Sequence, residues 1–287
     1  MNGLRSILVH MDAGARAELR LRVALRLASA SQAHLTALYA VTSAAYAMPM
    51  AVADGGASIA PLLASVDRDR FEAAHAMYRK VVSGLPADAP RPVWADAGHA
   101  PTYAAVAGRA LLADLLVFGQ HDPDDRRGTI DAELVAETLI ESGTPALVLP
   151  YAGDLDPAVL AGEGPVVALA WKPTRESARA ARAALPWLQG AREVHLAVES
   201  ATSSDELAPG VDDLKRWLEW HGVRAPVRHH AIGTSNAGEL LLSLAADVAA
   251  DLLVMGCYGH SRARELVLGG ASRTVLRTMT VPTLMAH

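Results

Sequence analysis

The chain has 287 residues, of which 51% are hydrophobic and only two are Phe, and its formal net charge is −5. This length allows one large domain or two ordinary ones. The negative charge argues against a broad nucleic-acid surface, because binding to phosphate backbones needs a basic stripe.

Neither a disulfide framework nor a membrane segment is expected. Cys257 is the single cysteine, and no apolar run approaches the roughly 20 residues that span a bilayer. The segment MNGLRSILVHMD at 1–12 lacks a basic stretch followed by an apolar core and a cleavage site. We therefore expect a cytoplasmic protein with no membrane partner and no nucleic-acid partner.

The first half begins with a strand-like apolar run, SILVHM at 6–11. The stretch 41–61 lacks apolar periodicity and contains Gly and Pro, so it predicts a long loop or lid. Two more strand-like runs follow, ADLLVFG at 113–119 and TPALVL at 144–149. The segment 151–164 is rich in Gly, Pro and Asp, which is typical of a linker.

The second half alternates short apolar runs with longer amphipathic segments, which is typical of β-α-β order. Asn236 and Glu239 have the spacing of a capping box, which predicts a helix start there. The expected strands occupy 165–170, 193–198, 226–232, 251–256 and 281–286, and the expected helices 175–187, 205–221, 236–249 and 270–279.

The second half also repeats the first. ADLLVMG at 250–256 matches ADLLVFG, and VPTLMA at 281–286 matches TPALVL, both at an offset of 137 residues. The opening run PVVALA at 165–170 matches SILVHM at an offset of 159, so the first half carries 22 extra residues, which the stretch 41–61 accommodates. This self-similarity indicates an internal duplication.

We therefore expect two tandem, Rossmann-like α/β domains at 1–150 and 165–287, each a doubly wound, five-stranded parallel sheet. Ligands of such sheets lie beyond the carboxyl ends of the strands, at the switch point between the first and fourth strands of a 2-1-3-4-5-like order. Assembly into a homo-oligomer stays open.

Four glycines lie between a predicted strand and the last predicted helix: Gly256, Gly259, Gly269 and Gly270. The first N–H groups of a helix have no intrahelical partner and lie at its positive end, so they favour an anion. A tight strand-to-helix turn explains the glycines equally well. The Walker A pattern with its lysine and the pattern G-x-G-x-x-G are both absent, so the loop does not predict phosphoryl transfer of the P-loop type.

The run LLVMGCYGHSRARELVLGGASRTVLRTMTVPTLMAH at 252–287 closely resembles the C-terminal signature of the universal stress protein family. Nucleotide-binding members of that family carry G-x2-G-x9-G-[ST]. The segments DLLVFGQ and TPALVLP of the first half resemble the same region in degenerate form, so the whole chain resembles a tandem pair. The resemblance implies a five-stranded parallel α/β fold and binding of ATP or AMP, with Mg²⁺ as an optional companion of the nucleotide. Since single-domain members of the family pair through the last strand, it also implies that 145–149 and 281–286 pair as an intrachain pseudo-dimer.

Carried over by position, the resemblance implies that Gly256 and Gly259 approach the ribose and phosphates, and that Gly269 and the N–H groups after it hold the phosphates. Gly270 stands where the family motif has Ser or Thr. Trp171 stands where the family has an Asp that meets the adenine. The expected nucleotide-binding residues are Gly256, Gly259, His260, Gly269, Gly270, Ala271, Ser272 and Trp171.

The first half has the family's Asp as Asp12, and its degenerate site contains Gly119 and Asp122. The loop HDPDDRRGTIDAE at 121–133 is acidic where the second half has glycine, and carboxylates repel a polyphosphate. We therefore expect this site to have lost polyphosphate binding. An acidic metal loop is the rival interpretation, but the segment lacks the EF-hand spacing, and no metal site is expected.

Other residues admit two interpretations each. Cys257 is either a reactive thiol near a helix start or a small loop residue. His229 and His230 are neighbours on a strand and point to opposite faces, so they do not readily share a metal. Trp217 and Trp220 share a helix face and either pack in the core or line the contact between domains. No spacing suggests a catalytic triad or a carboxylate pair, so no catalytic residue is assigned.

The sequence predicts a regulatory or stress-response protein that binds an adenine nucleotide in its second half. One alternative is a scaffold or small-ligand-binding protein in which both sites are vestigial, and Trp171 and Gly270 favour it. The other is a slow nucleotide hydrolase, favoured by the glycine loop alone, because no residue is evident to position water or neutralise a leaving phosphate.

Overall fold

A computed structural model describes residues 3–47, 59–87, 89–98, 102–125, 129–130, 132–162, 164–199, 210–233, 235–257 and 270–287. Its strands are β1 Ser6–Met11, β2 His34–Tyr39, β3 Val93–Asp96, β4 Leu115–Gly119, β5 Ala146–Leu149, β6 Val166–Trp171, β7 Glu193–Glu199, β8 Val227–Ile232, β9 Leu252–Gly256 and β10 Thr283–Ala286. Its helices are α1 Ala17–Ser31, α2 Ala44–Ala47, α4 Ala60–Ser83, α5 Thr102–Ala110, α6 Ala132–Ser142, α7 Arg175–Ala183, α8 Leu185–Leu188, α9 Val211–Trp220, α10 Ala237–Asp247 and α11 Gly270–Thr278.

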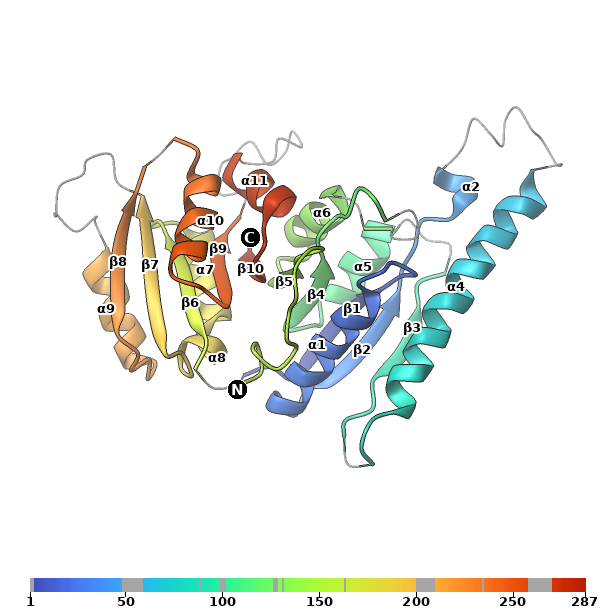
Figure 1. Cartoon of the computed structure of the whole chain (residues 1–287), viewed down its shortest axis with the longest axis horizontal. Helices are drawn as coiled ribbons and strands as arrows, with labels where there is room; N and C mark the ends of the chain where they lie inside the picture. Colours follow the sequence, from blue (N-terminus) through green and yellow to red (C-terminus); the bar gives the residue numbers. More distant parts are fainter. Residues whose placement is uncertain are drawn as a thin grey trace.

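All ten strands form one sheet, with the order β3-β2-β1-β4-β5-β10-β9-β6-β7-β8 (Figure 1). Within each half the strands are parallel, whereas β5 and β10 pair antiparallel, with Leu147 opposite Leu284. The expected pairing of the two last strands is thus confirmed. Each half has the order 3-2-1-4-5 and not the expected 2-1-3-4-5-like order, because β2 and β3 extend the sheet in succession before the chain crosses to the other side of β1. The switch point nevertheless lies between the first and fourth strands, as expected.

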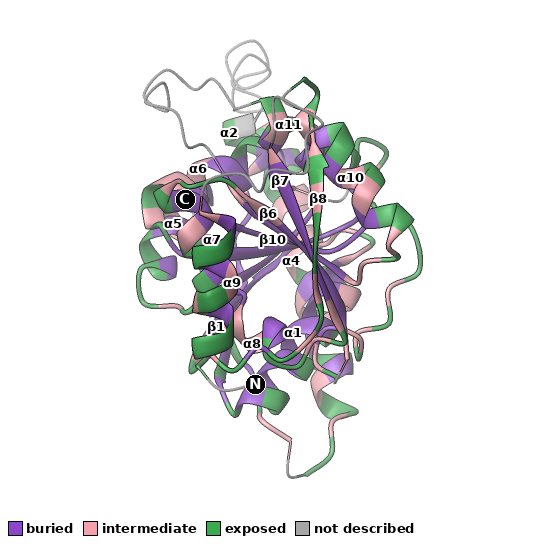
Figure 2. Ribbon diagram, turned by 90° about the vertical axis from the view of Figure 1, so that its left-hand side faces the viewer, coloured by how far each residue is buried: buried purple, intermediate pink, exposed green. Residues whose placement is uncertain are grey.

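The helices cover the two faces of this sheet in two sets. One core cluster joins the sheet to α1, α4, α7, α8 and α9, and the other joins it to α5, α6, α10 and α11. Strand residues alternate between the clusters, since Val9 and Leu169 belong to the first and Leu8 and Ala168 to the second. The central strands are therefore buried on both faces, as Figure 2 shows, which explains their almost continuous apolar sequence.

The expected helices of the second half are found, with three differences. The segment 175–187 is divided into α7 and α8, because Pro186 lacks a backbone donor. The capping box predicted at Asn236 is wrong: this residue has a left-handed backbone (φ 56°), and its side chain makes no capping hydrogen bond. Its carbonyl instead accepts from the N–H of Glu239 at 2.9 Å. The start of the expected helix 205–221, up to residue 209, lies outside the described residues.

The expected loop 41–61 is described only at its ends. α2 occupies Ala44–Ala47, and α4 begins at Ala60, so both ends contain helix where the sequence predicts loop. Residues 48–58 lie outside the described residues.

The strand register corrects the alignment between the two halves. Ile7 of β1 is paired with Leu115, and Val167 of β6 is paired with Leu252. Because Leu115 and Leu252 are equivalent at the offset of 137 residues, Ile7 corresponds to Val167. The offset between the first strands is therefore 160, and the offset of 159 expected from the sequence is wrong.

Two equivalent hydrogen bonds support the offset of 160. The backbone N–H of Ser6 donates to Oδ2 of Asp114 at 2.9 Å, and that of Val166 donates to Oδ2 of Asp251 at 2.8 Å. Each bond ties the start of a half's first strand to the residue before its fourth strand. The duplication therefore preserves the junction on which the switch point depends.

The predicted linker 151–164 contacts both halves. Arg16 of α1 donates to the carbonyl oxygens of Tyr151 and Gly153, both at 2.7 Å. The indole Nε1–H of Trp187 donates to the carbonyl of Leu160 at 2.8 Å, and Leu160 is fully buried. The domain boundaries at 150 and 165 stay a prediction, but this segment is anchored at both of its ends.

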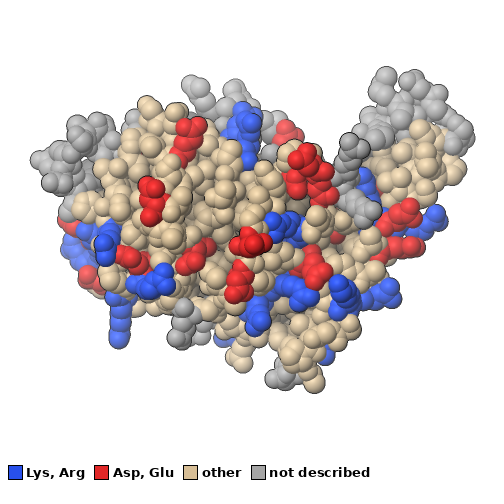
Figure 3. Space-filling model, viewed as in Figure 1, with Lys and Arg blue, Asp and Glu red and all other residues tan. Residues whose placement is uncertain are grey.

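The surface carries both signs of charge. On the face seen in Figure 3, Lys and Arg side chains are interspersed with Asp and Glu side chains, in line with the small negative net charge of the chain. Within the described ranges, no helix combines the length and the apolar character needed to cross a bilayer.

The junction between β5 and β10 gives a first prediction. Leu284 lies opposite Leu147, and both are fully buried. The change Leu284→Ala should lower the free energy of unfolding by about 2–5 kcal/mol, because it leaves a cavity where the two halves meet. Urea denaturation followed by circular dichroism measures this. The control is Leu112→Ala, at a side chain that is 88% exposed, which should change stability by less than about 0.5 kcal/mol. Equal effects of the two changes would contradict a buried junction.

Candidate functional site

The first-half site is centred on the carboxylate of Asp12, which follows β1 and is buried. Nη2 of Arg20, from α1, lies 2.6 Å from its Oδ1. Nε of Arg20 donates to the carbonyl oxygen of His10 at 2.8 Å. The guanidinium is itself buried, so the ion pair lies inside the protein at the carboxyl end of β1.

The segment after β4 closes over the same carboxylate. The backbone N–H of Thr129 donates to Oδ2 of Asp12 at 3.0 Å, and the N–H of Gly14 donates to Oδ1 at 3.2 Å. Asp125 accepts from the N–H of Ala15 at 2.7 Å. Both oxygens of Asp12 are thus occupied by the protein's own donors, and the acidic segment is held against the β1–α1 turn.

Gly119 explains how the arginine fits. A Cβ at this position would lie 2.7 Å from Nη1 of Arg20 and 3.1 Å from Cδ1 of Ile130. The glycine is therefore needed for the close approach of a side chain of this same chain. Asp122 makes a local turn, in which its Oδ1 accepts from the N–H of Asp124 at 3.0 Å.

The charge state of Asp12 follows from these contacts. Burial by itself raises the pKa of a carboxyl, but the charge of Arg20 and the hydrogen bond from Thr129 outweigh it and hold the pKa of Asp12 well below its usual range. The carboxylate is therefore ionised at neutral pH. It is also satisfied internally, so no acceptor of Asp12 is left for an adenine amino group.

The second-half site differs at both of these positions. At the corrected offset of 160, Lys172 corresponds to Asp12, and Trp171 corresponds to Met11. The expectation that Trp171 replaces the family's Asp is therefore wrong. Nζ of Lys172 lies 2.8 Å from Oε2 of Glu199, at the carboxyl ends of β6 and β7.

The helix after the first strand differs too. Burial repeats at the same offset, since Ala17, Arg20 and Leu21 of α1 are buried, and so are Ser177, Ala180 and Ala181 of α7. The place of Arg20 is thus taken by Ala180. The second-half site lacks a guanidinium and a carboxylate at these two positions, but Glu176 at the start of α7 is a buried carboxylate beside Gly256.

Gly256 ends β9 and lies against the start of α7. A Cβ on it would lie 2.5 Å from the backbone N of Ser177 and 2.7 Å from the carbonyl carbon of Glu176. Oγ1 of Thr174 accepts from the N–H of Ser177 at 3.3 Å and caps this helix. Gly256 therefore has a packing role, in the same way as Gly119 in the first half.

The start of α11 is more open. Gly270 is exposed, and a Cβ on it would meet no atom within 4 Å among the described residues. Ala271 is held against α10, where its carbonyl oxygen would lie 2.9 Å from a Cβ on Gly238, and Ser272 is buried. The predicted positions Gly259, His260 and Gly269 lie outside the described residues. The structure thus brings Trp171 and Gly256 to the carboxyl ends of β6 and β9.

Cys257 is a buried core residue. Burial, and then the nearby charge of Glu176, raise the pKa of its thiol, so the thiolate that a nucleophile or redox group needs is disfavoured. The interpretation as a small loop residue is therefore supported.

The two histidines of β8 point to opposite faces, as predicted, because His229 pairs with Leu196 and His230 with Ala197. Nε2 of His230 lies 2.9 Å from Nδ1 of His195. Across the described part of the chain, no group of three or more His, Cys, Asp or Glu side chains could hold a metal ion.

Sequence reasoning missed four residues of these sites: Arg20, Thr129, Lys172 and Glu199. Arg20 was detectable in principle, since it is a charged residue on the apolar stripe of an amphipathic helix. Lys172 was obscured by the alignment error of one residue, which only the strand register reveals. The hydrogen bond of Thr129 is a tertiary contact without a sequence signal.

The comparisons with known proteins agree with this fold. Residues 166–287 match the model of the universal stress protein family. A universal stress protein of Synechocystis is 33% identical over 92 residues, which are 32% of this chain and 31% of that protein, so the match spans about a third of this curated relative.

Solved structures extend the likeness to the whole chain. A universal stress protein from Archaeoglobus fulgidus aligns with a TM-score of 0.59 at 14% identity, over 98% of this chain and 96% of that one. A putative universal stress protein from Pseudomonas aeruginosa has the same TM-score at 17% identity, over 99% and 93% of the two chains. At these identities the structures establish the fold alone.

The fold defines a class: a tandem Rossmann-like protein with a switch point between the first and fourth strands of each half. The family match is confined to the second half, whereas the shared architecture spans both. Residues 166–287 match the universal stress protein family, and the whole chain shares the fold of solved universal stress proteins.

The ion pair in the first half gives a second prediction. The change Asp12→Asn leaves Arg20 buried without a counter-charge, and it should lower stability at pH 7 by about 3–5 kcal/mol. A depressed pKa in the folded state stabilises the protein above the unfolded pKa of about 4, and this stabilisation is lost as the pH falls toward the folded value. The difference between wild type and variant should therefore shrink below pH 4. Urea unfolding at pH 7 and pH 3 tests this, with Asp122→Asn as the control. A difference that grows on acidification would refute the assignment.

The glycines of the second half give a third prediction. The change Gly256→Ala forces a methyl group against the start of α7 and should cost about 1–3 kcal/mol of stability. Gly270→Ala introduces the same group into open space and should cost less than about 0.5 kcal/mol. Thermal unfolding followed by calorimetry compares the two variants. If both are equally tolerated, Gly256 has no packing role.

Proposed function

We propose that this protein is a regulatory or stress-response factor that binds an adenine nucleotide, ATP or AMP, in its C-terminal half. The observation that carries the proposal is the difference between the two sites. In the first half Arg20 and Asp12 fill the carboxyl end of β1 with a buried ion pair. The second half has Ala180 and Lys172 at the same places, and the exposed Gly270 opens α11.

Electrostatics favour an anion in the second half. Lys172 contributes a positive charge at the carboxyl end of β6, and the first N–H groups of α11 lie at the positive end of a helix dipole. A helix terminus stabilises a nearby negative charge by about 0.3–1 kcal/mol, and a unit charge at 4 Å by about 1–4 kcal/mol in wet surroundings. Glu199 offsets part of the effect of Lys172, and Glu176, which is buried beside Gly256 and paired with Arg175, adds a second carboxylate. The terms together support phosphate binding of moderate strength.

The adenine base is expected to contribute less to the binding free energy than the phosphates. An ammonium group has donors only, so Lys172 does not accept a hydrogen bond from the adenine amino group as an Asp does. The affinity is therefore proposed to rise with phosphate charge, from AMP to ATP. Any Mg²⁺ would arrive with the nucleotide, and no residue is assigned as its ligand or as a catalytic base.

One observation favours a second candidate function. The loss of the adenine-binding carboxylate is what a protein with a vestigial nucleotide site would show, because Lys172 takes the place of an acceptor. The alternative is therefore a scaffold or a protein that binds a different small ligand. Slow hydrolysis of the nucleotide is a weaker alternative, for want of a base to orient water.

The fourth prediction separates these functions. Isothermal titration with ATP, ADP and AMP, with and without Mg²⁺, should show one ATP site per chain. Gly259→Asp places a carboxylate in the glycine loop and should weaken ATP binding at least tenfold, since repulsion of 1.4 kcal/mol or more corresponds to that factor. Gly108→Asp, on the exposed side of α5, is the matched control and should leave binding unchanged.

Two other outcomes of the titration would support one of the alternative functions. No heat of binding at millimolar ATP would refute the nucleotide function and support the scaffold. Phosphate release above the background of Gly259→Asp would indicate a hydrolase.

A further inference from the structure

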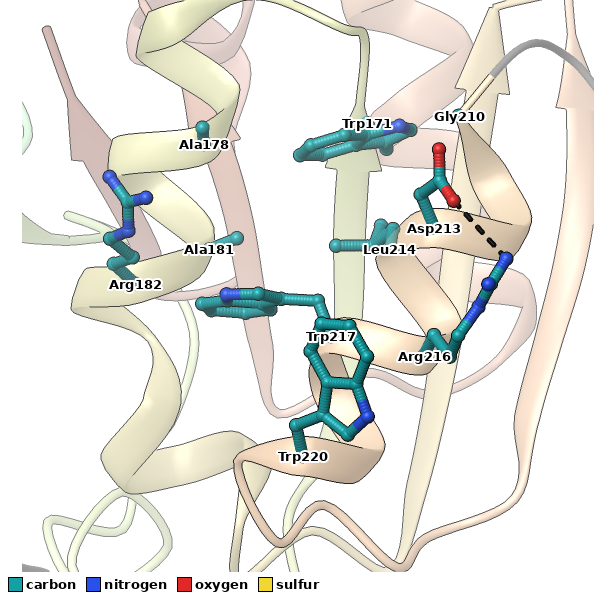
Figure 4. A pocket seen from close by; sticks show the side chains of 10 residues that line it. All are labelled: Trp171, Ala178, Ala181, Arg182, Gly210, Asp213, Leu214, Arg216, Trp217 and Trp220. Carbon is teal, nitrogen blue, oxygen red and sulfur yellow. Dashed lines mark hydrogen bonds and ion pairs between the residues drawn. The ribbon is translucent and has the colours of Figure 1, made fainter.

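A cavity of about 520 Å³ lies between α7 and α9, within the range typical of small-ligand sites. Figure 4 shows Trp171, from the end of β6, at one end of the cavity and Trp217 and Trp220, from α9, at the other. Ala178 and Ala181 of α7 form the opposite wall. The space exists because small side chains on one helix face large ones on the next.

The first half fills the equivalent face with its own rings. Tyr39 and Phe71 contact edge to face with centroids 5.2 Å apart, and the rings of Tyr78 and Trp94 lie 4.9 Å apart. These side chains come from β2, β3 and α4, the counterparts of β7, β8 and α9. In the second half, Trp171 and Trp217 pack partly against the core cluster and also line the cavity, and Trp220 is 76% exposed. Core packing therefore accounts for only part of the surface of these indoles.

Two polar groups of the cavity have no partner within the described ranges. Nε1–H of Trp171 is buried and makes no hydrogen bond there. Arg182, which is exposed at the rim, has neither an ion-pair partner nor a hydrogen-bond partner in the same ranges. The other charged residues of the rim satisfy each other, because Nη2 of Arg216 lies 3.2 Å from Oδ1 of Asp213.

We propose that this cavity binds a planar aromatic acid. The ring system would lie among the three indoles, which offer flat apolar faces. Its carboxylate or sulfonate would accept from the guanidinium of Arg182. The first requirement corresponds to the three indoles, and the second to a guanidinium that has no partner within the described ranges.

The charges at the rim disfavour a cation, which is another class of ligand that aromatic pockets bind. A quaternary ammonium ion is attracted to indole faces, but a net positive charge at the rim of a pocket repels it. Among the described lining residues, two arginines and one aspartate lie at the rim, so their net charge is positive. An anion is therefore favoured over a cation of the same shape.

The site is distinct from the proposed nucleotide loop. Trp171 and Trp217 pack with the cluster that includes α7 and α9, whereas Ala271 and Val275 of α11 pack with the cluster on the other face of the sheet. A ligand in the cavity and phosphates at the start of α11 would thus lie on opposite sides of the sheet. The inference does not depend on nucleotide binding.

The fifth prediction uses 1-naphthoate as the probe on the full-length protein. We expect saturable quenching of tryptophan fluorescence with a stoichiometry of one per chain. 1-Naphthylmethylammonium, which has a similar ring and the opposite charge, should bind at least tenfold more weakly. Equal binding of both probes, or no saturation at millimolar naphthoate, would overturn the proposal.

Paired variants locate the site. Arg182→Gln should weaken naphthoate binding about tenfold, in line with the loss of a charge-assisted hydrogen bond, whereas Arg26→Gln on the exposed side of α1 should not. Ala178→Leu should abolish binding by filling the cavity, and its far-ultraviolet circular dichroism should match that of wild type. An equal effect of both Arg variants would indicate a general charge effect and refute the site. Loss of naphthoate binding in Gly259→Asp would place the ligand at the nucleotide loop and would also refute it, whatever the outcome with ATP.

Discussion

The antiparallel pairing of β5 with β10 is the interaction on which this structure depends. It joins two parallel half-sheets into one, and it buries Leu147, Thr283, Leu284 and Met285 completely. Without it each half would expose the edge of its last strand, with a row of unpaired backbone groups and apolar side chains. A duplicated chain can satisfy both edges with each other, and the linker anchored on Arg16 and Trp187 keeps the two halves in one molecule.

Once the halves are joined, their two sites are free to diverge. In the first half, the protein's own side chains fill the site. The ion pair of Arg20 and Asp12 occupies the carboxyl end of β1, and the backbone N–H of Thr129 donates to Asp12. The second half has a lysine and an alanine at the same two places. One buried guanidinium, which fits because residue 119 is glycine, thus distinguishes the first site from the second.

The same contrast holds on the face that carries α1, α4, α7 and α9. The first half packs Tyr39, Phe71 and Trp94 against one another, whereas the second half presents Trp171, Trp217 and Trp220 to a cavity. The indole surface that lines the cavity is not covered by other side chains, which costs stability. Apolar surface of this kind is typical of a ligand-binding site. In the first half, aromatic side chains pack against one another on this face, whereas in the second half a cavity lies at the equivalent place.

The sequence by itself determined the architecture. The 137-residue repeat and the short apolar runs were sufficient for two tandem parallel α/β domains, because strands buried on both faces must be continuously apolar and helices must be amphipathic. Most predicted strands and helices of the second half lie within a few residues of the observed ones. The pairing of the last strands was expected from the resemblance to the family, whose single-domain members pair in this way.

Only the tertiary structure decided what each site contains. An error of one residue in the strand offset moved Trp171 onto the position of Lys172, because similar apolar runs can be matched in more than one register and only hydrogen-bonded pairing fixes it. The partners of Asp12 come from α1 and from the segment after β4, 8 and 117 residues away in sequence. The cavity depends on the distance between α7 and α9, which no local pattern encodes. The periodicity of the sequence predicts secondary structure, whereas a site depends on contacts between residues that are distant in the sequence.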